Sequence, residues 1–173
     1  MAGRLVMFTG LPGTGKSVLA EYAARFIECS LLSKDTIEAS LWRSDVGSEQ
    51  NSGWASYEVM TTLAECQLRL GQSVVLDSVA THERIRSTWR DMALKHGASF
   101  VAIECVCTDE MLHRTRLSQR SRNIPGWYEI DWSQVAATRN RYEPCVDQRL
   151  VLNAITPLDD NLNALRDYLS GAQ

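Results

Sequence analysis

A glycine-rich loop near the N-terminus constrains the fold of this chain more than any other feature. The segment "GLPGTGKS", residues 10–17, fits the pattern G-x-x-x-x-G-K-[ST]. An apolar run of strand length, residues 4–9, precedes it, and a segment with helical periodicity, residues 16–28, follows it. Because the pattern requires this strand–loop–helix context, the sequence predicts a loop that binds the phosphates of a nucleoside triphosphate. A glycine turn with an exposed lysine is the alternative interpretation.

Each residue type in the loop has a physical role in holding phosphate. Glycines let the backbone curl so that its N–H groups point at the β-phosphate, and the following helix adds partial positive charge. Lys16 is expected to reach the β- and γ-phosphates, and the Ser17 hydroxyl to ligate Mg²⁺. The absence of an N-K-x-D segment favours ATP over GTP. The predicted nucleotide contacts from this loop are Gly10, Leu11, Pro12, Gly13, Thr14, Gly15, Lys16, Ser17 and Val18.

Strand-like and helix-like segments alternate along the chain. The predicted strands are 4–9, 30–33, 73–78, 99–107 and 150–153. The predicted helices are 16–28, 35–43, 54–70, 82–96, 109–121, 132–142 and 159–170. Nearly continuous apolar strands are typical of a parallel sheet that is covered on both faces. The sequence therefore predicts one doubly wound α/β domain over residues 1–173, with a five-stranded parallel sheet.

Composition narrows the classes of protein to consider. The chain has a net charge of −3 and a pI of about 5.6, which does not favour coating of nucleic acid. No apolar run approaches the roughly 20 residues that span a bilayer, and no secretory signal is recognised, so a cytoplasmic protein without membrane association is expected. The odd count of five cysteines argues against a disulfide framework.

Two aspartates end predicted strands, where the carboxyl edge of a parallel sheet would place them beside the glycine loop. Asp77 is expected to support Mg²⁺, and the next residue is Ser78 rather than the water-activating glutamate common in motor-type ATPases. Asp35 is placed to accept a proton from an incoming hydroxyl group. For each aspartate, capping of the following helix is the alternative.

Four arginines crowd into the segment "RTRLSQRSR". Arg116 and Arg120 are four residues apart and are expected to share a helix face. Arginine binds phosphate oxygens and neutralises charge on a transferring phosphoryl group, so residues 109–131 are predicted to form a helical lid over ATP. A solvated basic surface is the alternative.

These motifs, taken in order, resemble small P-loop kinases of the zeta-toxin, chloramphenicol-phosphotransferase and polynucleotide-5′-kinase group. The matching segments are "GKS", "SKD", "LD", "LHRTRLSQR" and "YEP", and they extend over nearly the whole chain. The resemblance implies that Asp35 is the general base, that Lys16 clamps the phosphates and that Arg116 and Arg120 occupy the lid positions. It also places adenine near the lid arginines and the turn around Pro157.

The acceptor is less constrained by the sequence. Polynucleotide kinases of this group tend to have an arginine three residues after the base, where this chain has Glu38, so an uncharged or amine-bearing acceptor is easier to accommodate. Trp54, Tyr57 and Arg84 are candidates for the acceptor pocket because of their positions near the loop 44–53 and after Asp77. The leading hypothesis is an ATP- and Mg²⁺-dependent kinase for a small-molecule hydroxyl. A kinase for polynucleotide 5′-hydroxyls and an ATP-binding regulatory module without an acceptor are the alternatives.

Overall fold

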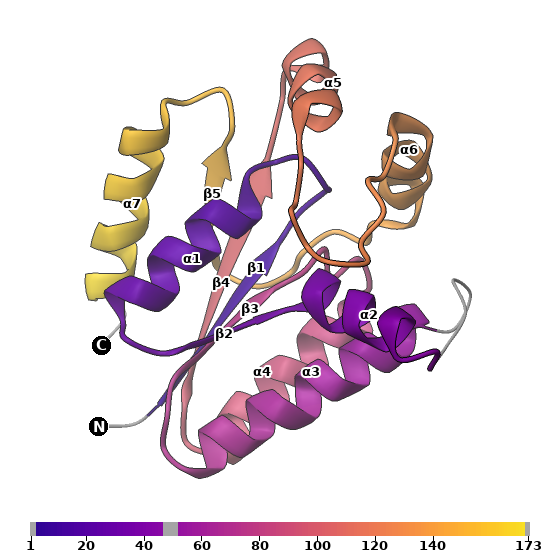
Figure 1. The fold of residues 1–173 in the computed structure, drawn as a ribbon. Helices are drawn as coiled ribbons and strands as arrows, with labels where there is room; N and C mark the ends of the chain where they lie inside the picture. Colours follow the sequence, from indigo (N-terminus) through magenta and orange to yellow (C-terminus); the bar gives the residue numbers. More distant parts are fainter. Residues whose placement is uncertain (1–2, 47–51, 172–173) are drawn as a thin grey trace.

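Five parallel strands form the centre of the computed structural model, which describes residues 3–46 and 52–171 (Figure 1). The strand order is β2-β3-β1-β4-β5, with all neighbouring pairs parallel. The strands are β1 (Arg4–Thr9), β2 (Ser30–Ser33), β3 (Val74–Asp77), β4 (Ser99–Val106) and β5 (Arg149–Asn153). The predicted fold class is confirmed, because the five expected strands form a parallel sheet within an α/β fold.

Helices cover both faces of the sheet (Figure 1). They are α1 (Lys16–Phe26), α2 (Lys34–Arg43), α3 (Ser52–Arg69), α4 (Glu83–Lys95), α5 (Glu110–Gln119), α6 (Trp132–Arg141) and α7 (Leu158–Gly171). One core lies between the sheet and α3 and α4, and the other between the sheet and α1 and α7. None of the helices within the described residues is long and apolar enough to cross a bilayer. Of the loop predicted at 44–53, residues 47–51 lie outside the described residues.

The central strand shows why the apolar runs are continuous. Leu5 and Met7 contribute to the core beneath α3 and α4, whereas Val6 and Phe8 contribute to the core beneath α1 and α7. All four side chains are fully buried. A strand that is covered on both faces needs apolar residues at every position, so the alternation of polar and apolar residues is lost.

Strand register brings the functional segments to one edge. Asp77, the last residue of β3, pairs with Phe8 of β1 and with Ser33 of β2. The glycine loop follows β1 and α2 follows β2, so both begin beside Asp77. Helices α5 and α6 and the segment between them lie over this carboxyl edge (Figure 1).

A buried arginine fixes the connection that leaves α6. Arg86 of α4 is fully buried and donates to the carbonyl oxygens of Ala80 (2.7 Å), Glu143 (2.9 Å) and Pro144 (3.0 Å). The Glu143 N–H also donates to the Thr81 carbonyl at 2.9 Å. These bonds hold the C-terminal end of α6 against the carboxyl edge of the sheet.

Candidate functional site

The glycine loop has a conformation that requires glycine at its first position. Gly10 has φ +130°, and a Cβ atom there would lie 2.0 Å from the carbonyl oxygen of Cys105 in the neighbouring strand. Helix α1 begins at Lys16 directly after Gly15, so the unpaired N–H groups of its first turn belong to the loop. The loop is thus shaped to bind an anion at a helix N-terminus.

Lys16 lies inside the loop rather than in solvent. Its side chain is buried and its Nζ donates to the Leu11 carbonyl at 2.9 Å. Burial lowers the pKa of Lys16, and the nearby Asp77 carboxylate acts in the opposite direction. The predicted alternative of an exposed lysine on a glycine turn is therefore wrong.

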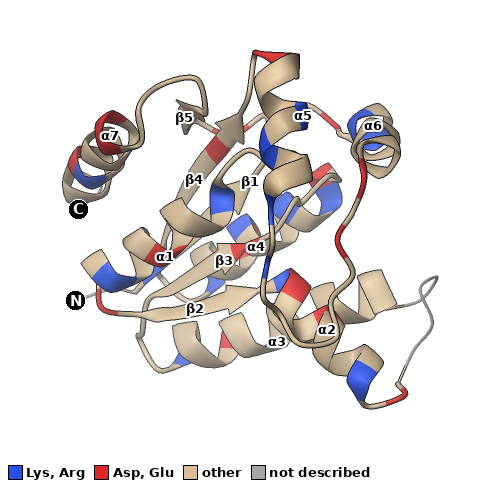
Figure 2. Ribbon diagram, turned by 45° about the horizontal axis from the view of Figure 1, so that its top comes forward, with Lys and Arg blue, Asp and Glu red and all other residues tan. Residues whose placement is uncertain are grey.

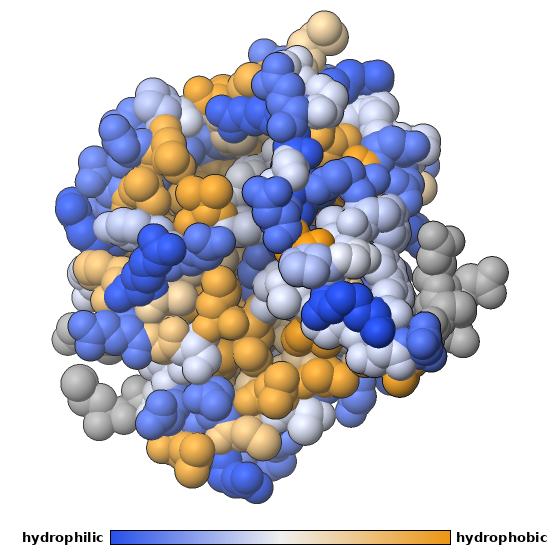
Figure 3. Space-filling model, viewed as in Figure 1, coloured by the Kyte–Doolittle hydropathy of each residue, from blue (hydrophilic) through white to orange (hydrophobic). Residues whose placement is uncertain are grey.

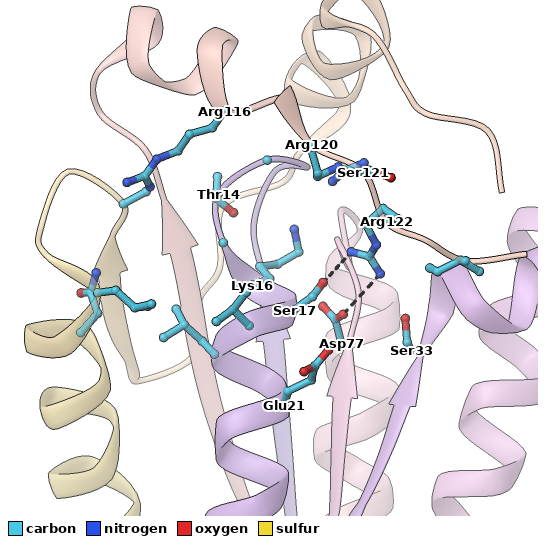
Figure 4. Close-up of a pocket in the computed structure, with 18 of the residues that line it drawn as sticks. Thr14, Lys16, Ser17, Glu21, Ser33, Asp77, Arg116, Arg120, Ser121 and Arg122 are labelled. Atoms are coloured by element: carbon cyan, nitrogen blue, oxygen red, sulfur yellow. Dashed lines mark hydrogen bonds and ion pairs between the residues drawn. The ribbon is translucent and has the colours of Figure 1, made fainter. Parts of the chain in front are cut away.

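One guanidinium joins the two aspartates to the loop. Arg122 Nη1 donates to Ser17 Oγ at 2.5 Å, and its Nη2 lies 3.9 Å from Asp77 Oδ2 (Figure 4). The same Nη2 lies 3.5 Å from Asp35 Oδ2. Burial raises the pKa of Asp77, and the Lys16 ammonium partly offsets this effect. A cation therefore sits among three oxygen-bearing side chains that come from α1, α2 and β3.

Neither aspartate caps a helix. The N-cap residue of α2 is Ser33 and that of α4 is His82, so the capping alternative does not describe Asp35 or Asp77. Both carboxylates are instead part of the group around Arg122.

A cavity of about 630 Å³ lies between the glycine loop, the arginine-bearing segment and the start of α7 (Figure 4). Gly13, Thr14, Gly15, Lys16, Ser17 and Val18 line it, together with Arg116, Arg120 and Arg122. At the far end it is lined by Ala154, Thr156 and Leu158, the residues around the predicted Pro157. Hydrophobic residues gather on the surface towards the start of α7, hydrophilic residues lie over α5, and the region of α1 carries both kinds (Figure 3). Gly10, Leu11, Pro12 and Pro157 themselves are not part of this lining.

A second cavity of about 300 Å³ lies on the other side of Lys16. It is lined by α2, by the end of β3, by residues Trp127, Tyr128 and Ile130, and by α6. Asp35 lines this second cavity only. The residues that line both cavities are Lys16, Asp77, Arg120 and Arg122.

The arginine-bearing segment differs from its prediction. Helix α5 ends at Gln119, and Arg120 has an extended backbone, so Arg116 and Arg120 do not share a helix face. The buried face of the helix consists of His113 and Leu117. The next residues on that face, Arg120 and Ser121, are polar, so no apolar contact stabilises a further helical turn. Glu129 arranges the extended part: its carboxylate lies 3.5 Å from Arg120 Nε and accepts the Arg122 backbone N–H at 2.6 Å.

Three residues predicted to bind the acceptor line neither cavity, although the Tyr57 ring lies 5.8 Å from Lys34 Nζ at the edge of the second one. Tyr57 is packed on Trp89 and accepts the Ala80 N–H at 3.0 Å, and burial raises its pKa to about 12. Trp54 is 55% exposed and stacks on His82 with ring centroids 5.8 Å apart. Arg84 projects from the exposed side of α4. Proximity in the sequence to Asp77 and to the loop 44–53 did not bring these side chains to the site.

The sequence analysis assigned no individual role to Arg122 or His113. The structure places both side chains against the glycine loop. Arg122 was counted only as a member of the arginine cluster. His113 is buried, donates from Nε2 to the Pro12 carbonyl at 2.7 Å, and meets Trp132 edge-on with centroids 5.1 Å apart. Its spacing of four residues from Leu117 on the buried face of α5 was the available signal.

Comparison with known proteins agrees with this geometry. A family model described as an AAA domain matches residues 5–145. The chain belongs to this AAA domain family. The matched part of the AAA domain runs from β1 through α6 and so contains the glycine loop, both aspartates and the lid arginines. No curated protein matches the chain significantly.

Solved structures share the fold over the full length. A Chloroflexus aurantiacus protein assigned only as a kinase is 19% identical over 100% of both chains, with a TM-score of 0.77. Chaetomium thermophilum Kti12, solved with ADP-AlF3, is 18% identical over 97% of this chain and 98% of its own, with a TM-score of 0.74. Mycobacterium tuberculosis APS kinase CysC, solved with AMPPNP and APS, is 18% identical over 98% of both chains, with a TM-score of 0.68. The AAA domain described here therefore has the fold of small P-loop kinases, as its resemblance implied.

Proposed function

We propose that this protein is an ATP-dependent kinase that transfers the γ-phosphate to a hydroxyl group of a small molecule. The observation that carries the proposal is the pair of adjoining cavities. One cavity contains the phosphate-binding loop, and the other contains Asp35. The two cavities share a wall that is lined by Lys16, Asp77, Arg120 and Arg122. A donor and an acceptor bound in the two cavities would meet at this shared wall.

The first cavity suits ATP. The loop and α1 supply N–H groups and Lys16 for the phosphates, and the residues around Thr156 leave room for the base. Two proteins with this fold were solved with nucleotides, Kti12 with ADP-AlF3 and APS kinase with AMPPNP and APS, which supports the assignment of the cavity.

The residues present fit Mg²⁺. A hydroxyl oxygen of Ser17 and a buried carboxylate of Asp77 are hard oxygen donors, and they already accept a cation in the form of Arg122. Ser17 would ligate the ion, with Asp77 behind it. When bound, Mg²⁺ supplies positive charge to the β- and γ-phosphate oxygens.

In the proposed reaction the acceptor hydroxyl oxygen attacks the γ-phosphorus. A new O–P bond forms, the bond between the γ-phosphorus and the β,γ-bridging oxygen breaks, and ADP leaves with that electron pair. Asp35 takes the hydroxyl proton. Lys16, Arg120 and Arg122 hold the transferring group and neutralise charge on its oxygens. The segment 109–131 acts as the lid that keeps water from the γ-phosphate.

The second cavity supports a small acceptor. Its volume of about 300 Å³ is smaller than the 630 Å³ of the first cavity, which is proposed to hold ATP. Glu38 is neutralised by an ion pair with Lys34 and accepts a hydrogen bond from Ser52 Oγ at 3.0 Å, so its charge does not by itself decide the class of acceptor.

The test is a panel of hydroxyl compounds incubated with the protein, Mg²⁺ and ATP, and read by mass for a gain of one phosphate. The proposal expects a phosphorylated small molecule and no product with a Lys16→Met variant. Preferential labelling of 5′-hydroxyl oligonucleotides would assign a polynucleotide kinase instead. ATP binding without product from any hydroxyl compound would leave a nucleotide-binding module.

A further inference from the structure

The second cavity holds an excess of positively charged groups. The cationic lining residues are Lys16, Lys34, Arg120, Arg122 and Arg141, and the carboxylates are Asp35, Glu38 and Asp77. Basic segments of α5, of the chain after it and of α6 surround this edge of the sheet (Figure 2). Some of these charges are compensated by ion pairs within the protein, and others are not.

The carboxylates are all engaged. Glu38 is 6% exposed and binds Lys34 and Ser52. Asp35 and Asp77 share Arg122. Within the described residues, no carboxylate of the lining forms an ion pair with Arg120 or Arg141.

The groups left without acceptors are hydrogen-bond donors. Arg120 Nε and Nη2 and Trp127 Nε1 are buried and have no hydrogen-bond partner within the described residues. The ion pair between Arg120 and Glu129, at 3.5 Å, is longer than a hydrogen bond. The Arg141 side chain is exposed and has neither a hydrogen bond nor an ion pair with any described residue. A buried donor that lacks an acceptor is costly, so the Arg120 and Trp127 groups call for ligands that supply acceptors, and the exposed Arg141 adds an uncompensated positive charge at the same cavity.

Arg141 lies at the end of α6, a helix that is stabilised by hydrogen bonds at both ends. Gln134, Thr138 and Arg141 are spaced at i, i+4 and i+7 on α6, and all three line the cavity. The helix begins with a capping box at Asp131, and the Arg86 bonds hold the chain directly after its other end. A guanidinium on a fixed helix can orient a ligand with less entropic cost than one on a mobile loop.

We infer that the acceptor carries an oxyanion, a carboxylate, phosphate or sulfate group, which binds to Arg141 and to the free Nε1–H donor of Trp127, while Arg120 holds the transferring phosphoryl group. The hydroxyl of the same molecule faces Asp35, and this part rests on the proposed function. An oxyanion offers only acceptors, and the guanidinium fork matches its geometry. An amine-bearing acceptor would add a cation to a cavity whose cationic side chains already outnumber its carboxylates. We therefore propose an anionic acceptor in place of the uncharged or amine-bearing acceptor expected from Glu38 alone.

The anion subsite is tested by binding, with the first cavity filled. Saturating AMPPNP and Mg²⁺ occupy the glycine loop, and sodium sulfate, methyl phosphate or acetate is then added at constant ionic strength while thermal unfolding is followed. The wild-type midpoint is expected to rise relative to chloride. Arg141→Gln should weaken the apparent affinity about 10- to 100-fold, the usual effect of losing a charge-assisted hydrogen bond, and Arg141→Lys should restore part of it.

Arg69→Gln is the matched control, because Arg69 is an exposed arginine at the end of α3 that lines neither cavity. It should respond to the anions as the wild type does. Equal stabilisation of the wild type and Arg141→Gln, or no stabilisation beyond that by chloride, would overturn the inference. The anion with the lowest apparent dissociation constant identifies the class of oxyanion.

Activity separates this inference from the proposed function. Each hydroxy acid is compared with its neutral amide, and Arg141→Gln should raise KM for the acid at least tenfold with little change in KM for ATP. Transfer to the amide as efficient as to the acid would refute the oxyanion and leave the kinase assignment intact. Anion binding that depends on Arg141, without transfer to any hydroxyl compound, would keep the subsite and remove the kinase assignment.

Discussion

Replacing Asp35 by asparagine tests the central step of the proposed reaction. Asparagine has nearly the same size but accepts a proton poorly, so the shape of the second cavity should be kept. The loss of a general base lowers the transfer rate by about 10²–10⁴-fold. At 1.36 kcal/mol for each factor of ten, this corresponds to about 2.7–5.4 kcal/mol in the activation barrier.

The structure predicts that this variant will still bind nucleotide. Asp35 lies outside the first cavity, and its 3.5 Å ion pair with Arg122 joins side chains that are 23% and 15% exposed. Solvent screens this pair only weakly. The 3.5 Å distance between its nitrogen and oxygen atoms is nevertheless too long for a strong hydrogen bond, so loss of the pair should change the free energy of unfolding only slightly. We expect the affinity for AMPPNP and Mg²⁺ to stay within about threefold of the wild type, less than 1 kcal/mol.

Two measurements test whether Asp35 acts as the general base or contributes to nucleotide binding. Calorimetric titration gives the affinity for AMPPNP, and the mass-detected product gives kcat. Asp91→Asn, at an exposed acid of α4, is the control for the chemical change itself. Transfer by Asp35→Asn at the wild-type rate would refute the role of Asp35 as base. A parallel collapse of AMPPNP affinity would show that Asp35 acts on the nucleotide instead.

The other predictions concern the metal, the charge on the phosphoryl group and the pH. Ser17→Ala and Asp77→Asn should each raise the Mg²⁺ concentration needed for half-maximal transfer, and an unchanged Mg²⁺ titration would contradict the ligand assignment. Arg122→Gln should lower kcat by about 10²–10³-fold, and a smaller loss than for Arg69→Gln would exclude Arg122 from the transfer step. Burial lowers the pKa of His113, so the native state binds fewer protons there than the unfolded state, and the free energy of unfolding should fall as the pH drops below about 6.5. Urea unfolding of the wild type and His113→Gln at pH 5.5 and 7.5 measures this, and equal losses in the two proteins would exclude His113 as the cause.

The sequence predicted those features that depend on local pattern. The glycine loop specifies its own backbone, because Gly10 must approach Cys105 more closely than a Cβ allows. The doubly covered strand β1 needs an unbroken apolar run, and that run is visible without a structure. The carboxyl ends of parallel strands lie at one edge of the sheet, which is why Asp77 was expected beside the loop.

The sequence did not predict contacts between segments that are distant along the chain. Arg122 and Asp35 are separated by 122 − 35 = 87 positions, and no periodicity records that their side chains meet. The end of α5 depends on where buried contacts stop, so Arg120 left the helix although the sequence pattern permits another turn. Tyr57 was expected at the acceptor because of its position, but its ring fills the core between α3 and α4.

The contact between Arg122 and Ser17 joins the proposed metal ligand to the proposed lid segment. The hydroxyl that accepts the Arg122 bond at 2.5 Å is the same one that is proposed to ligate Mg²⁺, and two cations in contact with one oxygen repel each other. Binding of Mg²⁺ at Ser17 would therefore compete with Arg122, and a displaced guanidinium would lie beside the shared wall where the γ-phosphate is expected. It follows that Arg122→Gln should affect two measurements in opposite directions: the Mg²⁺ concentration for half-maximal binding of ADP should fall, because a competitor is removed, while kcat also falls. A higher Mg²⁺ requirement in this variant would mean that Arg122 assists the metal site rather than competing with it.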